Sequence, residues 1–477
     1  MSLPGLSCFQ NIVFNDFYPQ ADALYVNKAK GAGVTVYDTC TYINIFSFNI
    51  WKENTTAETF YLNLRYSGSG TVTVNLTGDN LISRQRISVE LQSDAGEYLL
   101  PVYEGDFSYA YISWEETENF KLTGAAWLAK CSEPAHDIRL AICIPTYKRR
   151  ADISSTLALY ERVINTQKGF AAATHLFVHN NDPDDDLRGL STCPQVTIIN
   201  SEANIGGAGA FNRCAHLAVE NGYSHVLFMD DDAQPHEEAW LRTLALLKCL
   251  KPEKHEYFIA GNCLTREDPL FCHAVREAID ERGRIKCHQI GQFQLTEQEQ
   301  LEVALSACIS HGVGQDTHPY AAWWYCAIPC IAFQRYGWPE ERFFCFGDDI
   351  EFSLACKAKI ICCNGINVWH PSFDRPMNPL RRYFSVRNFF FIRKKFFGKK
   401  NLYKSFFKQL YRLLLSNEFY NAQVTSKAFY DLIESNYFEI SSIRKEIPKN
   451  RGVLISALYT VCMCIKITIN IGRWQNA

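Results

Sequence analysis

The chain has 477 residues, of which 47% are hydrophobic and 14% aromatic, and its formal net charge is -3. This composition predicts a globular protein with two or three domains and excludes a disordered or fibrous chain. The small negative charge argues against a globally basic nucleic-acid-binding protein.

The 19 cysteines include no CxxC pair, and the start MSLPGLSCFQ lacks the charged and apolar regions of a secretory signal. We therefore expect reduced, mostly buried thiols and a cytoplasmic protein. The longest apolar run, Val453 to Ile465, stops at Lys466 and is shorter than the roughly 20 residues that cross a bilayer. It is typical of a core segment or of a helix that lies on a surface.

Residues 1–135 are expected to form a β-sandwich or jelly-roll domain. Between Tyr25 and Trp127, short segments of alternating polar and apolar residues, such as Thr59 to Gly78, are separated by Gly, Ser, Asn and Asp. This alternation is typical of half-buried antiparallel strands. The hinge-like stretch Cys131 to Asp137 follows them.

Residues 136–378 show a regular alternation of apolar strands and amphipathic helices that begins at Ile138. Strands that are separated by helices predict an α/β domain with a mostly parallel sheet. Ligands of such sheets bind at the carboxyl ends of the strands, so the polar residues that end these strands are the first functional candidates.

Residues 379–477 are expected to form a helical region that is rich in basic and aromatic residues. No acidic residue occurs between Asp374 and Glu418, and residues 379–412 mix Lys, Arg and Phe at helical spacing. This pattern suits an anionic membrane surface. An ordinary helix pair with Phe in its core and solvated Lys is an equal alternative. No nucleic-acid-binding motif accompanies the charge, so nucleic acid is not an expected partner.

The sharpest chemical signal is the apolar segment HVLFM, which runs into Asp230, Asp231 and Asp232. Three adjacent carboxylates repel each other unless a cation or hydrogen-bond donors compensate them. Strand geometry would point Asp230 and Asp232 to one side, where they would share a divalent ion, Mn²⁺ or Mg²⁺. This is the arrangement of the DxD motif, in which the metal contacts the diphosphate of a nucleotide sugar. A solvated, helix-capping loop before Pro235 is the alternative.

Two segments further along the chain add candidate groups. Asp348 and Asp349 open an apparent helix, and Asp349 is the candidate base for the acceptor hydroxyl in an inverting sugar transfer. Capping of the helix is the alternative role for this pair. His370 ends a short apolar strand and is either a third metal ligand or a structural histidine.

A glycine-rich turn opens the helix that follows Asn204. Gly206 and Gly207 would let backbone donors approach the phosphate or sugar of a donor. A dinucleotide-binding enzyme would use a similar turn. However, Asn212 replaces the third glycine of GxGxxG, and the turn does not follow the first strand of the sheet.

Taken in chain order, these motifs resemble those of the galactofuranosyltransferases that build bacterial galactan. CIPTYKRR resembles the uridine-binding loop of that family, MDDDA its metal motif, GDDIEF its catalytic-base motif and VWHPSF the segment that carries its metal histidine. The resemblance covers roughly Ile138 to Asn388. It implies a central GT-A domain between an N-terminal β-sandwich and a C-terminal helical region. The tail after Asn388 is divergent and shorter, which leaves processive polymerisation open.

The resemblance also implies the roles of individual residues. The catalytic base is Asp349, and the metal ligands are Asp230, Asp232 and His370. The donor-binding residues are Thr146, Arg149, Asn204, Gly206, Gly207 and Asp231, and the acceptor-binding residues are His273, Glu277, Trp323, Trp324 and Asp348. The two tryptophans are equally compatible with an ordinary aromatic core. We expect His273 and Glu277 to share a helix face or a loop near the sugar.

The function that follows is transfer of galactofuranose from UDP-galactofuranose to a hydroxyl of a bacterial cell-surface glycan, such as a galactan, O-antigen or capsule. Rhamnosyl and other nucleotide-sugar transferases share most of the motifs and remain alternatives for the donor. A catalytically inactive, glycan-binding scaffold that works through its β-sandwich is an alternative of another class. A lipid-linked acceptor would place the enzyme at the inner face of the cytoplasmic membrane. The sequence does not indicate an oligomeric state.

Overall fold

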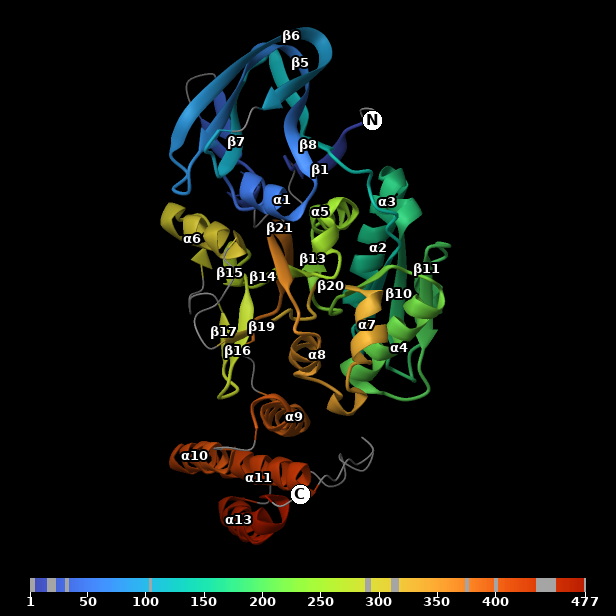
Figure 1. Ribbon diagram of the computed structural model, residues 1–477, viewed down its shortest axis with the longest axis vertical. Helices are drawn as coiled ribbons and strands as arrows, with labels where there is room; N and C mark the ends of the chain where they lie inside the picture. Colours follow the sequence, from blue (N-terminus) through green and yellow to red (C-terminus); the bar gives the residue numbers. More distant parts are fainter. Residues whose placement is uncertain are drawn as a thin grey trace.

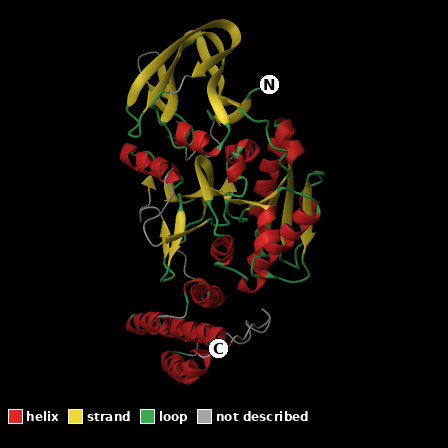
Figure 2. Cartoon of the chain, viewed as in Figure 1, coloured by secondary structure: helices red, strands yellow, loops and turns green. Residues whose placement is uncertain are grey.

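The computed structural model describes residues 5–14, 23–30, 34–102, 105–287, 293–309, 317–373, 377–398, 402–434 and 452–475. From one end to the other, the described chain forms a curved antiparallel sheet, a mixed sheet with helices on its faces, and a stack of helices (Figures 1 and 2). The cysteines whose side chains are described are free thiols, and most of them are buried.

The N-terminal strands form one hydrogen-bonded sheet in the order β1-β8-β5-β7-β3-β2, with β6 paired to β5 and β4 paired to β7. These strands are hydrogen-bonded into one continuous sheet. The expected β-sandwich, which needs two packed layers, therefore stays a prediction. The elements are β1 (Ser7–Ile12), β2 (Asn27–Lys30), β3 (Thr35–Asp38), β4 (Phe46–Ser47), α1 (Phe48–Asn54), β5 (Ala57–Thr77), β6 (Ser83–Val102), β7 (Tyr109–Glu116) and β8 (Phe120–Cys131).

Strand β5 corrects the expectation of short strands in this region, because it runs unbroken through the sequence YSGSGT. The two glycines in that sequence do not end the strand. At Gly68 the backbone φ is +84° and the pairing with β6 shifts, and the ring of Phe120 packs where a side chain at position 70 would lie. Glycine therefore permits a bulge and a close approach here, and the strand curves instead of stopping.

The central sheet is mixed, where the sequence had predicted a mostly parallel one. Strands β11, β10, β9 and β12 are parallel, β20 lies antiparallel between β12 and β14, and β21 runs parallel to β14. The strands are β9 (Leu140–Thr146), β10 (Thr174–Asn180), β11 (Val196–Asn200), β12 (His225–Phe228), β13 (Gln234–Pro235), β14 (Phe258–Thr265), β15 (Phe271–Ala274), β18 (Phe293–Gln294), β20 (Cys326–Pro329) and β21 (Ile360–His370).

Helices and a small second sheet surround the mixed sheet. The helices are α2 (Arg150–Thr166), α3 (Lys168–Ala173), α4 (Gly206–Glu220), α5 (Glu237–Cys249), α6 (Gln298–Ile309), α7 (Cys330–Tyr336) and α8 (Asp348–Cys356), with 3₁₀ turns η2 (Arg188–Leu190), η3 (Pro252–Lys254) and η4 (Glu341–Phe343). The small sheet has the order β17-β16-β19, formed by β16 (Glu277–Asp280), β17 (Ile285–Cys287) and β19 (Thr317–Tyr320).

The C-terminal part of the described chain is helical, with α9 (Pro379–Phe397), α10 (Leu402–Leu415), α11 (Phe419–Glu434) and α13 (Val453–Gln475). A separate apolar cluster centred on Phe384, Phe406 and Phe429 holds these helices together. Within the described ranges, none of the helices is both long enough and apolar enough to span a bilayer. The domain boundaries at residues 135 and 378 stay predictions.

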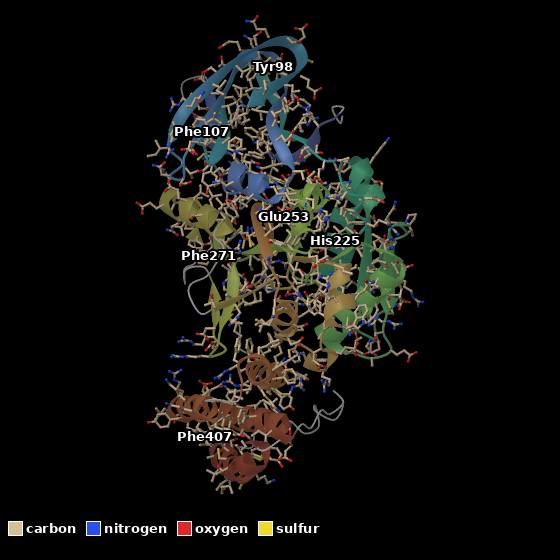
Figure 3. The ribbon with its side chains drawn as sticks, viewed as in Figure 1. Tyr98, Phe107, His225, Glu253, Phe271 and Phe407 are labelled. Atoms are coloured by element: carbon tan, nitrogen blue, oxygen red, sulfur yellow. The ribbon has the colours of Figure 1, made fainter. Side chains whose placement is uncertain are left out.

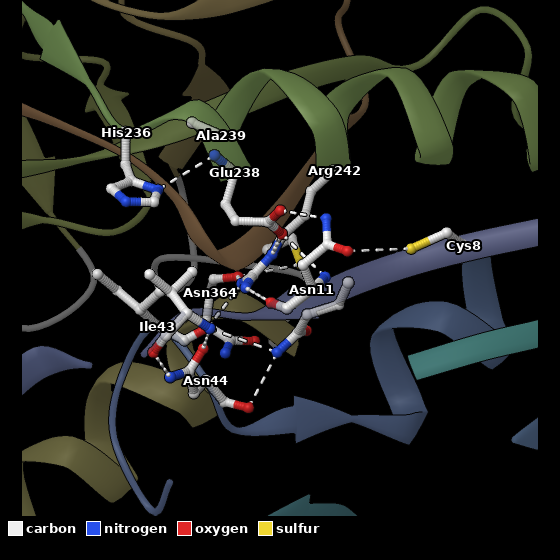
Figure 4. Close-up of polar contacts among 12 residues, drawn as sticks. Cys8, Asn11, Ile43, Asn44, His236, Glu238, Ala239, Arg242 and Asn364 are labelled. Carbon is white, nitrogen blue, oxygen red and sulfur yellow. Dashed lines mark hydrogen bonds and ion pairs between the residues drawn. The ribbon is translucent and has the colours of Figure 1, made fainter. Parts of the chain in front are cut away.

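A buried ion pair on α5 joins the N-terminal sheet to the mixed sheet (Figure 4). The Arg242 guanidinium lies 3.0 Å from the Glu238 carboxylate and donates to the backbone oxygens of Asn11, Ile43 and Asn364. The backbone φ of Gly365 is +76°, and a Cβ there would lie 1.7 Å from an Arg242 nitrogen. One guanidinium therefore connects β1, the segment before β4, α5 and β21.

Removing that guanidinium should weaken the whole fold. In Arg242→Met, Glu238 keeps its burial but loses its cation, so we expect the free energy of unfolding to fall by about 3–5 kcal/mol. Urea unfolding followed by tryptophan fluorescence measures this change. Arg335→Met is the control, because it breaks an exposed pair with Glu256 and should leave the unfolding curve unchanged. Equal shifts in both variants would contradict a structural role for the buried pair.

Candidate active site

The predicted catalytic residues come together because several strands run in the same direction. Strand β12 leads into Asp230, and β21 ends at His370. Since β20 is antiparallel to both β12 and β14, and β21 is parallel to β14, β12 and β21 point the same way. Their carboxyl ends therefore lie at one edge of the sheet, where α/β proteins bind ligands.

Asp230, Asp232 and His370 form a group whose ligand atoms all lie within 4.8 Å of one another. The His370 Nε2 lies 3.2 Å from an Asp232 oxygen, and its Nδ1 lies 2.7 Å from the backbone oxygen of Pro371. When Nδ1 donates to that oxygen, Nε2 presents its lone pair to the two carboxylates. Two carboxylate oxygens and one imidazole nitrogen are a donor set that fits a divalent metal ion.

Asp231 is not part of this group. It lies with Asp232 in the turn after β12, so the expected alternation along a strand does not apply to it. Its carboxylate accepts hydrogen bonds from the Thr146 hydroxyl at 2.8 Å and from the Tyr147 N–H at 3.3 Å. Arg149, which precedes α2, forms an ion pair with Asp232 and lies 3.7 Å from Asp231. The uridine-loop candidates Thr146 and Arg149 are thus joined directly to the acidic motif.

Burial and mutual repulsion control the charge of the acidic motif. Burial, followed by the neighbouring Asp232, raises the pKa of Asp230 to about 6, and burial raises the pKa of Asp231 to about 7 against the opposing effect of Arg149. Burial also opposes ionisation of Asp232, but His370 and Arg149 outweigh it and hold the pKa of that carboxyl below its usual range. The motif therefore favours a further positive charge.

The second acidic pair opens α8, as its sequence indicated. Burial is the main cause that raises the pKa of both Asp348 and Asp349 to about 7. The second cause is the negative charge of a neighbouring acid, which is Asp349 for Asp348 and Glu277 for Asp349. The charge of Asp230 also raises the pKa of Asp349, so the two acidic motifs act on each other electrostatically. A carboxyl group with a pKa near neutral is suited to general-base catalysis.

Glu277 lies on β16 and His273 on β15, so the expected shared helix face or loop is wrong. The Tyr320 hydroxyl donates to one Glu277 oxygen at 3.0 Å, while the other oxygen is buried without a partner. Burial raises the pKa of Glu277 to about 8. The His273 ring lies 4.7 Å from that of Phe373, which connects it to the aromatic side of the site.

The glycine turn lies where the sequence predicted, at the start of α4. The Asn204 side chain accepts from the N–H of Gly206, whose φ is +79° and whose missing Cβ leaves room for the backbone oxygen of Phe344. Gly207 is more open, with only that oxygen near the position of a Cβ, at 3.9 Å. Glycine is therefore required at position 206, where Phe344 packs closely. At position 207 the space beside the backbone is open.

The two candidate tryptophans differ. Trp323 is 4% exposed and packs against Phe211 and Phe228 at ring distances of 5.1 and 4.7 Å, so its surroundings are those of a core side chain. Trp324 is half-buried, donates from its indole N–H to the backbone oxygen of Gly261, and lies 6.5 Å from the His370 ring. Trp324 is thus the tryptophan that could offer a face to a sugar.

Sequence reasoning missed two residues near these groups. Phe373 is 48% exposed and stacks on His370 with ring centroids 4.5 Å apart. Asn181, just after β10, accepts from the Ile205 N–H and donates to the Gly206 oxygen, and so holds the glycine turn. Phe373 lies in the motif VWHPSF and Asn181 ends the run HLFVHNN, but neither residue type signals a role without its neighbours.

Comparisons with known proteins agree with this geometry. Residues 141–251 match the model of Glycosyl transferase family 2. The chain is 24% identical over 460 residues to galactofuranosyltransferase GlfT2 of Mycolicibacterium smegmatis, with 86% of this chain and 67% of that protein covered. GlfT2 of Mycobacterium tuberculosis is 23% identical over 457 residues, with 86% and 68% covered.

Among solved structures, a mannosyltransferase of Pyrobaculum calidifontis in complex with GDP-Man and Mn²⁺ is 13% identical and covers 70% of this chain and 88% of its own. Its TM-score of 0.36 is too low to support an argument. The family match and the two relatives are sufficient to state that the chain is a glycosyltransferase. Its particular likeness is to galactofuranosyltransferases, which confirms the resemblance that the motifs indicated.

The metal-ligand group should bind Mn²⁺ without any sugar donor. Isothermal titration calorimetry on the full chain measures this binding, and we expect Asp232→Asn and His370→Ala each to lower the affinity about tenfold or more. Asp185→Asn is the control, because Asp185 pairs with Arg150 on the surface. Equal Mn²⁺ affinity in all four proteins would show that these side chains do not hold the metal.

Proposed function

We propose that this enzyme transfers galactofuranose from UDP-galactofuranose to a hydroxyl of a bacterial cell-surface glycan, with inversion and in a single displacement. The single observation that carries the proposal is the metal-capable group formed by Asp230, Asp232 and His370 at the edge of the sheet; the charge of its Asp230 also raises the pKa of Asp349. A metal-binding group beside a carboxyl group of near-neutral pKa is what a leaving diphosphate and an attacking hydroxyl require.

The donor would lie along the carboxyl edge of the mixed sheet. Thr146 and Arg149 stand at the end of β9 and the start of α2, and Gly207, which has open space at the position of a Cβ, lies in the first turn of α4. The N-terminus of α4 favours negative charge. When bound, a divalent ion would neutralise charge on the departing diphosphate. The choice of galactofuranose rests on the names of the relatives and on the motif order.

Asp349 would accept the proton of the attacking hydroxyl. One of its oxygens accepts from the N–H of Ile350 at 2.8 Å, which fixes the orientation of the carboxyl group at the start of α8. Trp324 and Phe373 surround His370 with aromatic faces and would position the acceptor ring. Glu277 and Asp348 would hold the acceptor hydroxyls, and His273 lies beside Phe373.

Transfer is tested by incubating the full chain with Mn²⁺, a galactan-like acceptor and a panel of UDP- and dTDP-sugars. We expect UDP release with UDP-galactofuranose and a loss of at least about 10³-fold in Asp349→Asn, because the asparagine amide cannot take the proton. Glu340→Gln, which changes a carboxylate paired with Arg342, should keep the activity. Faster turnover of dTDP-rhamnose would contradict the donor, and glycan binding without any turnover would favour the scaffold alternative.

The pH dependence gives a second test of Asp349. A base must be deprotonated, so its activity is present above its pKa and is lost as the pH falls through that value. With a pKa of about 7, the rate constant for transfer should fall tenfold for each pH unit below that value. A bound cation would lower the pKa of Asp349 and so shift this decrease to lower pH. A rate that is unchanged between about pH 8 and pH 5 would exclude this role.

We also propose that the enzyme lies on the inner face of the cytoplasmic membrane, where a lipid-linked acceptor would be available. Helix α10 exposes one stripe on which cations alternate with apolar side chains, and α13 exposes further apolar residues. Figure 3 places Phe407 on α10, at the end of the molecule far from the N-terminal sheet. The stripe consists of Lys404, Phe407, Lys408, Tyr411, Arg412 and Leu415.

The α9 cations are less suited to membrane contact. Arg393 is 8% exposed and lies against Gly283, and Lys395 forms an ion pair with Glu351. Helix α9 buries Arg387, Arg393 and several Phe residues, whereas α10 exposes basic and apolar side chains, so the proposal of membrane contact concerns α10. An amphipathic helix with this composition binds anionic lipid interfaces.

Membrane contact is tested by co-sedimentation with vesicles that contain phosphatidylglycerol. We expect binding that weakens with salt and falls at least about tenfold when Lys404, Lys408 and Arg412 are all changed to Glu. Charge reversal of Arg84, Arg86 and Lys130, which are exposed on the N-terminal sheet, is the matched control. Equal vesicle binding by both triple variants would remove the proposal.

A further inference from the structure

A large cleft lies between the N-terminal sheet and the helices α2 and α5, away from the metal-ligand group. Its volume is about 880 Å³, which is within the usual range of small-molecule sites. Figure 1 shows the N-terminal sheet facing α2, α3 and α5 at this boundary. Every strand of the path β1-β8-β5-β7-β3-β2 contributes to the lining, together with Arg162 and Gln167 of the α2 end and the start of α5.

An aromatic platform forms part of the wall. Tyr37 and Trp114 are direct cross-strand partners on β3 and β7, and their rings stack at 5.1 Å with an interplanar angle of 10°. The edge of Phe14 meets Trp114 at 5.4 Å. Trp114 is thereby buried, and its indole N–H has no partner among the residues that the structure describes, while Tyr37 is partly exposed and lines the cleft. A flat, partly exposed ring on a rigid support is suited to stacking against a sugar ring.

Cations line the same cleft as this platform. Lys28 is the cross-strand partner of Tyr37 on β2, so both lie in one row on the same face of the sheet. Arg65 on β5 lies over Gly124 of β8, where a Cβ would come within 2.6 Å of its guanidinium. Among the described residues, the side chains of Lys28, Arg65 and Lys121 have no hydrogen bond or ion pair, although all three line the cleft.

Among the lining residues that the structure describes, the balance of charge is positive. Arg162 adds a fourth cation, against the carboxylates of Glu116 and Glu237, whereas Glu238 is neutralised by the buried Arg242. A cleft that holds both such cations and an aromatic face attracts an anionic ligand that also has sugar rings. A neutral sugar would use only the platform.

The cleft is separate from the metal-ligand group but shares helix α2 with it. Arg149, at the start of α2, pairs with Asp232, while Arg162 lies in the cleft near the other end of the same helix. The rise of an α-helix puts these two residues about 20 Å apart. A polymer held in the cleft could therefore extend toward the transfer site, whereas a single sugar could not occupy both.

We propose that this cleft is a second glycan site that binds an acidic oligosaccharide or polysaccharide, with Tyr37 as the stacking platform and Lys28, Arg65 and Lys121 as anion partners. The bound glycan is the acceptor or product of the same enzyme. The identification of the bound glycan as acceptor or product rests on the proposed function. The proposal that the cleft binds an acidic glycan does not depend on it.

Binding is measured without donor or metal, by isothermal titration calorimetry of the full chain with oligogalacturonate, a phosphomannan and neutral dextran. We expect the two acidic glycans to bind more tightly than dextran, and the better of the two identifies carboxylate or phosphate as the acidic group. Tyr37→Ala and Lys121→Glu should each weaken the acidic glycan about tenfold or more. Asp349→Asn should bind as the wild type does, which separates this site from catalysis.

Two matched variants guard against a simple folding defect. Tyr98→Ala removes an exposed tyrosine of the same sheet outside the cleft, and Arg86→Glu reverses an exposed charge there (Figure 3 shows Tyr98). Both should bind like the wild type. Lys121→Glu changes an exposed side chain without partners, so it keeps the test valid even if Tyr37→Ala is unstable. Unchanged affinity in Lys121→Glu, or equal binding of dextran and the acidic glycans, would overturn the proposal.

Discussion

Negative charge concentrated at the carboxyl edge of the mixed sheet is the constraint on which the site depends. Asp230, Asp231, Asp348, Asp349 and Glu277 come from three parts of the chain, and burial raises the pKa of each of them. Such groups remain ionised together only if cations or donors compensate them. Arg149, together with His370 in its protonated form, provides part of this compensation, and a divalent ion held by the neutral imidazole and the carboxylates would replace the charge of His370.

The scaffold keeps this edge in place from the opposite side. Arg242 fixes α5 against both β21 and the N-terminal sheet, and β21 then carries His370 to the edge where Asp232 precedes α5. The N-terminal sheet and the mixed sheet share one continuous apolar core, whereas the C-terminal helices have a separate one. The N-terminal sheet is therefore part of the framework of the catalytic edge as well as one wall of the cleft.

The three surfaces place different demands on one chain. The carboxyl edge of the mixed sheet concentrates acids, the cleft beside Tyr37 holds cations that have no partner within the described ranges, and the outer face of α10 combines cations with apolar side chains. A small overall charge of -3 thus conceals local excesses of both signs. The proposed metal, glycan and membrane contacts would each use a separate one of these surfaces.

The sequence by itself determined what local pattern controls: the strand before Asp230, the helix opened by Asp348, the strand ending at His370 and the glycine turn at Gly206. It also indicated the family resemblance, since several motifs in a fixed order are specific. It could not predict the antiparallel β20, the unbroken β5 or the strands that carry His273 and Glu277, because hydrogen-bond partners far along the chain decide these features. Only the tertiary structure separated Trp323 from Trp324, turned Arg393 inward and brought Phe373 onto His370, because burial depends on neighbours that sequence spacing does not specify.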